Sequence, residues 1–347
     1  MYFDYSATTP ICKKSLDAYV DISSKLVGNH QSKHDLGLNI QAQINKDSKQ
    51  FKTLLNLPSH FLTFTQNATM ANKIILEHIL HDPLNMHVLC GPFEHSSIVR
   101  VLGPLQRKGL KVEVLKTDKQ GNILIDTIRT QIQDKTKLVI VSAVDSELGI
   151  IQDVNAIKNM IGDIPMLVDA TQSITKVDID FKKIDYITFS AHKFYGPKGI
   201  GGFFSLKELT PHLGTQSYEL IHSACVALED TLNQDESNVI MFKDLILKSL
   251  QKEKQISINN PHNSIPHIIN MSLNTKDNVD LVTHFSKQGI YVSKGSACTK
   301  ENYSPNVYRL TQDLDRATSS IRISLSHLTT KKEVEALIKT IKEVDHL

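Results

Sequence analysis

Strand-like and helix-like segments alternate between about residues 60 and 205, and this alternation constrains the fold more than any other feature. Apolar runs such as Phe61–Thr65 and Lys137–Val144 are typical of buried strands, whereas the apolar residues of Met70–Leu80 keep helical spacing. Single helices between successive strands require crossover connections, which make the strands parallel and cover both faces of the sheet. The sequence therefore predicts an α/β fold with a mainly parallel central sheet, in which ligands bind at the carboxyl ends of the strands.

The alternation stops after Thr215. We expect a long helical region over residues 218–251 and then a smaller α+β unit. Its expected strands and helices cover residues 267–273, 279–287, 290–292, 321–324 and 331–347. The predicted domains are a large α/β domain, residues 13–215, and a small α+β domain made of residues 1–12 and 216–347, with the linking helical region in the second. Because no flexible linker separates them, we expect the two domains to pack tightly.

Composition excludes several classes of function. The 39 Lys and Arg residues nearly balance the 37 Asp and Glu residues, so no broad basic field favours direct nucleic-acid binding. The apolar stretches are strand-sized and no secretory signal pattern is visible, which predicts a cytoplasmic protein without a membrane segment. The four cysteines, at positions 12, 90, 225 and 298, fit neither a disulfide framework nor a paired zinc spacing. A functional cysteine here would act as a free thiol in a reducing compartment.

The densest cluster of reactive residues is Ser190–Gly202, which follows an expected strand over residues 186–189. Lys193 lies there beside a serine and a histidine, a placement that suits a lysine forming a Schiff base with an aldehyde cofactor. The alternative is a surface lysine in a Gly/Pro turn, and this stretch alone favours it.

A second cluster follows another buried strand, at Asp169 and Gln172. A buried aspartate needs a cation or several hydrogen-bond donors, and a protonated pyridine nitrogen is one such partner. Gln172 is placed to reach the phenolic oxygen of the same ring. The alternative for Asp169 is an ordinary helix N-cap.

Four further positions are candidates, each with a simpler alternative. Backbone amides at the start of the helix after Thr65, with the Thr69 hydroxyl, suit a phosphate, although capping also explains this threonine. His95 suits ring stacking or acid/base chemistry, or is merely structural. Arg322 suits a carboxylate clamp or is an edge-strand charge. Cys298 lies in a small polar loop whose lysines, Lys294 and Lys300, favour a thiolate.

In their order along the chain, these motifs resemble those of the cysteine desulfurases, pyridoxal 5′-phosphate (PLP) enzymes of the class V aminotransferase family. The similarity runs nearly from end to end, and its most specific segments are Asp4–Pro10, Val168–Ser173, Ser190–Gly202 and Gly295–Thr299. The last segment is similar to the group with a long cysteine loop. The resemblance implies the type I PLP-dependent aminotransferase fold, with a mainly parallel central sheet covered by helices and a smaller α+β domain. It also implies PLP as cofactor and a homodimer.

The resemblance implies a role for each matching residue. Lys193 would form the Schiff base, and the residues around the ring would be Asp169 at the pyridine nitrogen, Gln172 at the phenolic oxygen and His95 over the ring face. The residues holding the phosphate would be Ala68, Thr69, Ser190, His192 and, across the dimer, Thr215. Arg322 and Asn29 would bind the carboxylate of L-cysteine. Cys298 would take its sulfur as a persulfide, leaving L-alanine.

Departures from the family pattern predict a divergent paralogue. Ser146 stands where an asparagine is expected near the cofactor, and a Gly/His/Arg-rich stretch before Gly214 is missing. The longer tail of many family members is not seen after Leu347, and Met70 replaces an acidic residue. The expected sulfur acceptor is an iron–sulfur scaffold, a tRNA-thiolation enzyme or a small carrier protein. Two alternatives stay open: a related PLP lyase or aminotransferase such as a selenocysteine lyase, and a catalytically weak paralogue that serves as a sulfur-transfer interaction partner.

Overall fold

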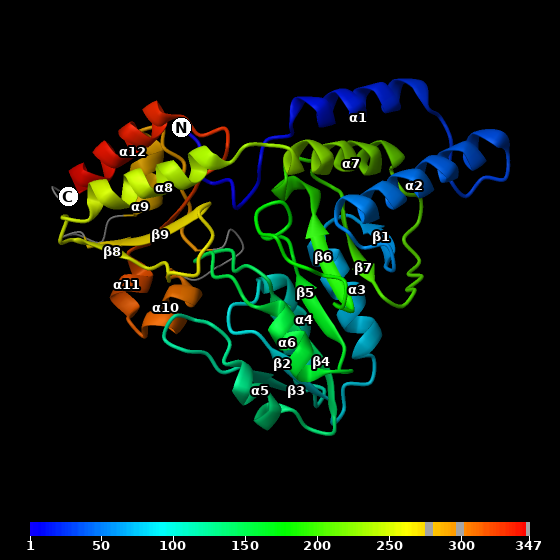
Figure 1. The fold of residues 1–347 in the computed structure, drawn as a ribbon, viewed down its shortest axis with the longest axis horizontal. Helices are drawn as coiled ribbons and strands as arrows, with labels where there is room; N and C mark the ends of the chain where they lie inside the picture. Colours follow the sequence, from blue (N-terminus) through cyan, green and yellow to red (C-terminus); the bar gives the residue numbers. More distant parts are fainter. Residues whose placement is uncertain (275–279, 296–301, 345–347) are drawn as a thin grey trace.

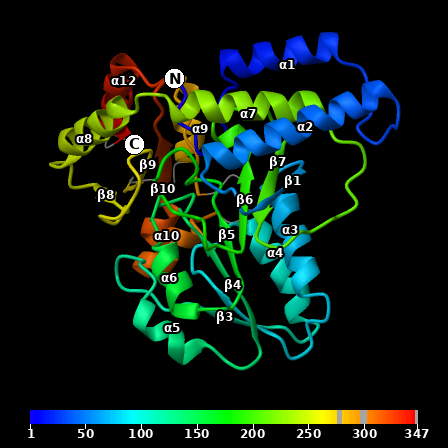
Figure 2. The ribbon, with the colours of Figure 1, turned by 45° about the vertical axis from the view of Figure 1, so that its right-hand side comes forward.

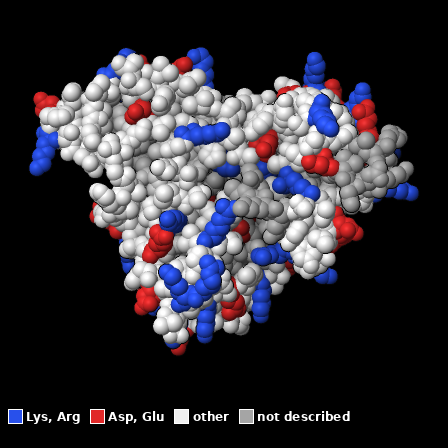
Figure 3. All heavy atoms as spheres, turned by 180° about the vertical axis from the view of Figure 1, so that it is seen from behind, with Lys and Arg blue, Asp and Glu red and all other residues white. Residues whose placement is uncertain are grey.

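The computed structural model describes residues 1–274, 280–295 and 302–344. These residues form a large α/β unit and a smaller α+β unit, which lie side by side in Figure 1. Within the described residues, no helix is long and apolar enough to cross a bilayer. On the face seen in Figure 3, acidic and basic side chains are interspersed over both units, as the near balance of charges leads one to expect.

In the described part of the chain, the large unit is built on a seven-stranded sheet with the order β1-β7-β6-β5-β4-β2-β3. Its strands are β1 (Phe61–Thr65), β2 (His87–Cys90), β3 (Lys111–Val114), β4 (Thr136–Ser142), β5 (Met166–Asp169), β6 (Tyr186–Ser190) and β7 (Gly201–Ser205). The strands from β2 to β6 pair in parallel, so the predicted mainly parallel sheet is confirmed. β7 runs antiparallel to β1 and β6, because the link between Ser190 and Gly201 is too short for a crossover.

Helices cover both faces of this sheet (Figure 2). They are α1 (Lys13–Lys25), α2 (Asp35–Leu54), α3 (Ala68–Ile79), α4 (Ser96–Gln106), α5 (Ile125–Gln131), α6 (Val154–Ile161) and α7 (Tyr218–Leu232). Alternate side chains of one strand enter opposite cores: Val139 and Val141 pack with α2, α6 and α7, whereas Leu138 and Ile140 pack with α3 and α4. Burial on both faces explains why the strands are continuous apolar runs.

The small unit has its own hydrophobic core. In the described residues its sheet has the order β10-β9-β8, from β8 (Ile256–Ile258), β9 (Ile268–Leu273) and β10 (Ser320–Ser324). The helices on this side are α8 (Ser237–Leu250), α9 (Leu281–Lys287), α10 (Pro305–Thr311), α11 (Leu314–Thr318) and α12 (Lys331–Glu343). α10 and α11 join the units, because Val307 and Ala317 pack against Phe93, Leu148 and Ile150 of the large unit.

The helical region expected over residues 218–251 is confirmed, as the two helices α7 and α8. The Asp235 carboxylate accepts hydrogen bonds from the amide and hydroxyl of Ser237, the first residue of α8. One expectation about secondary structure is wrong. Residues 290–292 form no regular strand, and Tyr291 makes only an isolated bridge to Tyr2. α7 also packs on the large sheet, although we grouped it with the small domain.

The segment of residues 1–9 runs between the two units. Phe3 lies in the core of the small unit, and its backbone pairs with Tyr291 (2.9 Å) and Ser324 (2.7 Å). A few residues later, the amide of Thr9 donates to the carbonyl of His192 (2.9 Å), on the loop that follows β6. This segment therefore ties the small unit to the loop that carries Lys193.

Candidate active site

A cavity lies where β4, β5 and β6 end, between the sheet, the N-terminal segment and β10. Nine of the candidate residues line it, namely Ala68, Thr69, His95, Asp169, Gln172, Ser190, His192, Lys193 and Arg322. Residues from distant parts of the sequence thus converge on one site, at the sheet edge where ligands of parallel sheets bind. Cys298 lies outside the described residues.

Lys193 enters the cavity from the short 3-10 turn Ala191–Lys193, directly after β6. Its Nζ donates hydrogen bonds to the carbonyls of Ser6 (2.5 Å) and Ala7 (2.9 Å). The pKa of Lys193 is lowered to about 7, mainly because the amine is buried and also because Arg322 and Lys176 are positively charged. The side chain is therefore not the surface lysine of the alternative reading, and a large share of it is a neutral, nucleophilic amine near neutral pH.

Asp169 is the last residue of β5 and is 6% exposed. One carboxylate oxygen accepts from the amide of Thr171 (3.0 Å) and the other from Nδ2 of Asn72 (3.1 Å). Residues 171–176 form turns and no helix begins there, so the helix N-cap alternative is wrong. Two donors hold the carboxylate at the cavity wall, where it can face a cationic ring nitrogen.

Asn72 connects Asp169 to His95, and the sequence analysis missed it. Asn72 is completely buried on α3; besides Asp169 it donates to Oγ of Ser97 (3.0 Å) and accepts from the Thr188 hydroxyl (2.9 Å). Oγ of Ser97 in turn lies 2.9 Å from Nδ1 of His95. Asn72 comes one helical turn after Thr69 on the same helix face, which was the available signal.

His95 caps the N-terminus of α4. Its Nδ1 accepts from the amide of Ser97 (3.2 Å), so in the neutral ring the proton lies on Nε2. Burial lowers the pKa of His95, which favours this neutral form. The cavity is therefore lined by a flat imidazole whose tautomer is fixed by the start of α4.

The start of α3 forms an anion-binding corner. Ser190 Oγ accepts from the amide of Ala68 (2.8 Å), and Thr69 lies beside them in the cavity wall. A Cβ on Gly201 would lie 2.5 Å from the Phe189 carbonyl oxygen, so only glycine lets β7 and the start of α3 approach β6 this closely. Amides and hydroxyls at a helix N-terminus suit a phosphate.

His192 lies close to this corner. Its Nδ1 is 3.1 Å from the Thr8 hydroxyl, and burial lowers the pKa of His192 to about 4. The ring is therefore neutral at physiological pH, and it would offer hydrogen bonds rather than charge to a phosphate.

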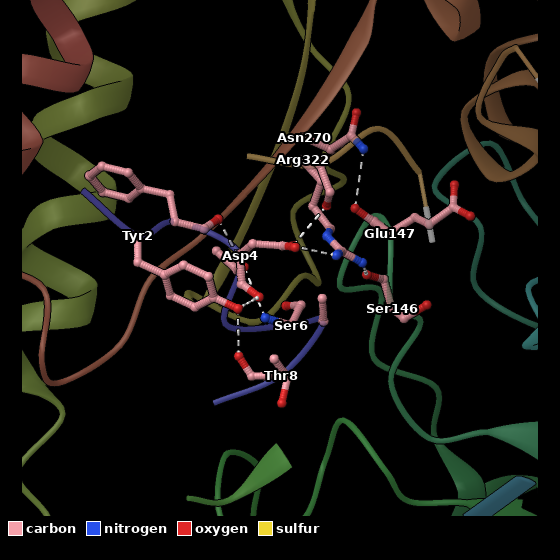
Figure 4. Close-up of polar contacts among 12 residues, drawn as sticks. Tyr2, Asp4, Ser6, Thr8, Ser146, Glu147, Asn270 and Arg322 are labelled. Carbon is pink, nitrogen blue, oxygen red and sulfur yellow. Dashed lines mark hydrogen bonds and ion pairs between the residues drawn. The ribbon is translucent and has the colours of Figure 1, made fainter. Parts of the chain in front are cut away.

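Arg322 reaches into the cavity from β10 between Asp4 and Ser146 (Figure 4). Its Nη2 donates to Oδ1 of Asp4 and its Nη1 to the carbonyl of Ser146, both at 2.8 Å. The side chain is only 1% exposed, so it is not the solvated edge charge of the alternative reading. Nε is buried and has no hydrogen-bond partner among the described residues, which leaves a donor for a ligand.

Two candidates lie away from this cavity. Nδ2 of Asn29 donates to Oγ1 of Thr215 (3.1 Å) at an exposed position, and neither residue lines the cavity. Within one copy of the chain, the structure does not bring Asn29 to Arg322.

The other cysteines occupy the positions expected for packing. Cys90 and Cys225 are buried, Cys12 is half-buried, and burial raises the pKa of all three thiols. Raised pKa values disfavour the reactive thiolate form. These three residues are therefore poor sulfur carriers.

This combination of fold and cavity agrees with comparisons to known proteins. The family model described as aminotransferase class-V matches residues 1–238 and 231–337. The chain belongs to the class V aminotransferase family. It is 29% identical over 376 aligned residues to the cysteine desulfurase IscS of Buchnera aphidicola, covering 100% of this chain and 93% of the relative. The resemblance to the cysteine desulfurases is thereby confirmed, and the chain is a divergent member of that branch.

Solved structures give the same fold. A NifS-like protein superposes with a TM-score of 0.88 at 26% identity, covering 99% of this chain and 98% of the other. The structure described as SspA in complex with cysteine gives a TM-score of 0.81 at 26% identity, covering 95% of this chain and 99% of the other. The expected type I PLP fold is confirmed.

The family uses PLP, so this cofactor is confirmed, and the cavity has the groups to hold it. Lys193 offers a partly neutral amine for the aldehyde, and Asp169 offers a carboxylate for the ring nitrogen. Ala68, Thr69 and Ser190 form the corner for the phosphate. The donor set of the cavity therefore fits the group.

Proposed function

We propose that this protein converts L-cysteine to L-alanine and holds the removed sulfur as a persulfide on Cys298 for transfer to an acceptor. The observation that carries this proposal is the convergence of Lys193, Asp169 and Arg322 on one cavity. The amine, the carboxylate and the guanidinium suit, respectively, the cofactor aldehyde, its ring nitrogen and an amino-acid carboxylate.

When bound, PLP supplies an electron sink for bonds broken at the substrate α-carbon. Asp169, held by Asn72 and Thr171, would keep the ring nitrogen protonated and so strengthen that sink. Lys193 would hold the cofactor and then carry the α-proton, since a pKa of about 7 lets Nζ both accept and release a proton at neutral pH. His95 would stack on the ring with Nε2–H facing the cavity.

Arg322 would bind the substrate carboxylate. Its guanidinium is already held at the cavity wall by Asp4 and the Ser146 carbonyl, so its orientation is fixed before a ligand binds. The Cys298 thiolate would then bond to the substrate sulfur while the Cβ–S bond breaks. Proton transfer to the remaining three-carbon fragment gives alanine, and one sulfur atom stays on Cys298.

We also propose a homodimer in which Thr215 of one copy reaches the phosphate corner of the other. On α1, α2 and the residues between them, Val20, Val27, Leu36 and Leu38 are each more than half exposed. Exposed apolar side chains concentrated in one part of the chain favour an interface with another protein surface. Thr215 and its partner Asn29 lie at an exposed position outside the cavity of their own copy, which supports a contribution in trans.

Cytoplasmic location, the division into residues 13–215 against 1–12 plus 216–347, and the kind of acceptor also remain proposals. An iron–sulfur scaffold, a tRNA-thiolation enzyme and a small carrier protein are the candidates for the acceptor. The separate cores of the two units support a division into two domains, and Phe3 in the small-unit core supports grouping the start of the chain with that unit. α7 packs in the core of the large unit, which favours a boundary after this helix.

The test combines product analysis with mass spectrometry. The purified protein, loaded with PLP and given L-cysteine, is expected to release alanine and to gain one sulfur atom on Cys298. Lys193→Ala and Cys298→Ala should each abolish alanine release, whereas Cys12→Ala is the matched thiol control and should not. If no variant or wild-type sample releases alanine above background, the proposal is wrong.

The same variants separate the alternatives. A selenocysteine lyase would process selenocysteine with Cys298→Ala nearly as well as with the wild type. A catalytically weak partner protein would bind PLP yet release no alanine from either substrate. Ser146, in place of the asparagine expected near the cofactor, is the observation that favours testing this second possibility.

A further inference from the structure

Lys176 lies behind the cavity wall and has no role in the chemistry above. Its Nζ donates to Oε1 of Gln172 (3.2 Å), four residues earlier in the same run of turns after β5. Burial lowers the pKa of Lys176 to about 8, so the ammonium form still predominates at neutral pH. A buried ammonium is costly unless its surroundings use the charge.

The hydrogen bonds of Gln172 continue from Lys176 to Lys193. Nε2 of Gln172 donates to the Ser6 carbonyl (2.9 Å), and the same carbonyl accepts from Nζ of Lys193 (2.5 Å). Gln172 is 4% exposed, so its amide has little freedom to find other partners. The two lysines therefore lie at opposite ends of one chain of hydrogen bonds.

This chain determines how the Gln172 amide is turned. An ammonium only donates hydrogen bonds, so the amide oxygen must face Lys176 and the NH₂ group must face the Ser6 side. One N–H is used by Ser6, and the second is left for the cavity, which Gln172 lines. If the amide were reversed, Oε1 would meet the Ser6 carbonyl, and two acceptors would repel each other.

We propose that Lys176 is a positioning residue that fixes the orientation of the Gln172 amide, so that an N–H donor faces the phenolic oxygen of PLP. The inference rests on the contact between Gln172 and the cofactor in the proposed function. It goes further because Lys176 itself touches neither cofactor nor substrate.

The charges around Lys176 come from three directions. Glu236, between α7 and α8, is attracted to it, and Arg322 on β10 repels it. Lys193 is also close enough to interact with Lys176 electrostatically. Burial, Arg322 and Lys176 all lower the pKa of Lys193, whereas Asp4 and Asp169 raise it. Removing the Lys176 charge therefore raises the pKa of Lys193 as well as freeing the Gln172 amide.

The test is PLP binding to apoprotein of the full chain, followed by absorbance. Lys176→Met should weaken PLP binding about tenfold, the size of one charge-assisted hydrogen bond. Lys176→Arg keeps a donor and a charge and should restore most of the affinity. Lys182→Met, at an exposed position in the same segment, is the matched control and should bind PLP as the wild type does.

A double-mutant cycle with Gln172→Leu tests whether Lys176 acts through the amide. If it does, Lys176→Met adds to the loss caused by Gln172→Leu only the part that comes from the raised pKa of Lys193. Full additivity of the two losses, or unchanged binding by Lys176→Met, overturns the proposal. If Lys176 has a purely structural role, Lys176→Met lowers the thermal stability of the apoprotein, and Lys176→Arg does not restore PLP affinity. That result also overturns the proposal.

The pH dependence of PLP capture is the second readout. Capture needs neutral Lys193, so its midpoint should move to higher pH in Lys176→Met and stay in place in Lys176→Arg. An unmoved midpoint in Lys176→Met counts against the arrangement of charges described here. These readouts need no cysteine, so they remain informative even if the wild type releases no alanine and the proposed reaction fails.

Discussion

Replacing Asp4 by asparagine tests the ion pair that holds Arg322. The two side chains meet at 2.8 Å, with Arg322 1% and Asp4 21% exposed, so little water reaches the guanidinium. Breaking a buried pair by removing one charge costs about 3–5 kcal/mol. Asparagine keeps one oxygen for Nη2, and Nη1 keeps the Ser146 carbonyl, so we expect a loss of about 2 kcal/mol in the free energy of unfolding.

Urea unfolding of the apoprotein measures this loss without interference from the cofactor. The matched control is Asp17→Asn, because Lys13 and Asp17 form a pair at 2.7 Å with side chains 84% and 60% exposed. Such a surface pair contributes less than about 0.5 kcal/mol, and salt screens it. The loss at Asp4 should persist in high salt. The reasoning is refuted if Asp4→Asn loses no more stability than Asp17→Asn.

Three further outcomes are expected. Because Schiff-base formation needs the neutral amine, PLP capture by the apoprotein should rise with pH, with a midpoint near pH 7, and level off about one unit higher. A midpoint near the ordinary lysine pKa of 10.5 would contradict the burial of Lys193. Asn72→Leu removes one hydrogen bond each from Asp169, Ser97 and Thr188 and should cost about 3 kcal/mol of stability in urea, with weaker PLP binding. Ser146→Asn restores the amide expected near the cofactor and should tighten PLP binding about threefold in an absorbance titration, whereas unchanged affinity would show that this position does not reach the cofactor.

The parts of the fold that follow from local pattern could be predicted from the sequence. Strands such as β5 and β6 are short apolar runs between helices, and Asp169 and Lys193 stand out because they follow those runs directly. Residues 290–292 have the composition of a strand, but their backbone partners are near Tyr2, at the other end of the sequence. No local pattern reveals that the partner segment is too short to form a ladder.

The missed residues are polar side chains in ordinary surroundings. Asn72 and Ser97 lie on helices, where an isolated polar residue usually marks the solvent face. Only the packing of α3 against β6 and α4 shows that Asn72 is completely buried and bonded on three sides. Lys176 was missed for the same reason, because a lysine in a polar turn gives no sign that its ammonium group meets a buried glutamine.

The segment that ties the two units together also sets an order of assembly during synthesis. A ribosome makes residues 2–7 well before β10. The ion pair between Asp4 and Arg322 joins residues that are 318 positions apart, so it cannot form until Arg322 has been made. The carbonyls of Ser6 and Ala7 that receive Lys193 are thus held in place only after β10 has emerged from the exit tunnel. A nascent chain can complete its large sheet early, but it cannot finish the pocket for the cofactor until β10 has been made.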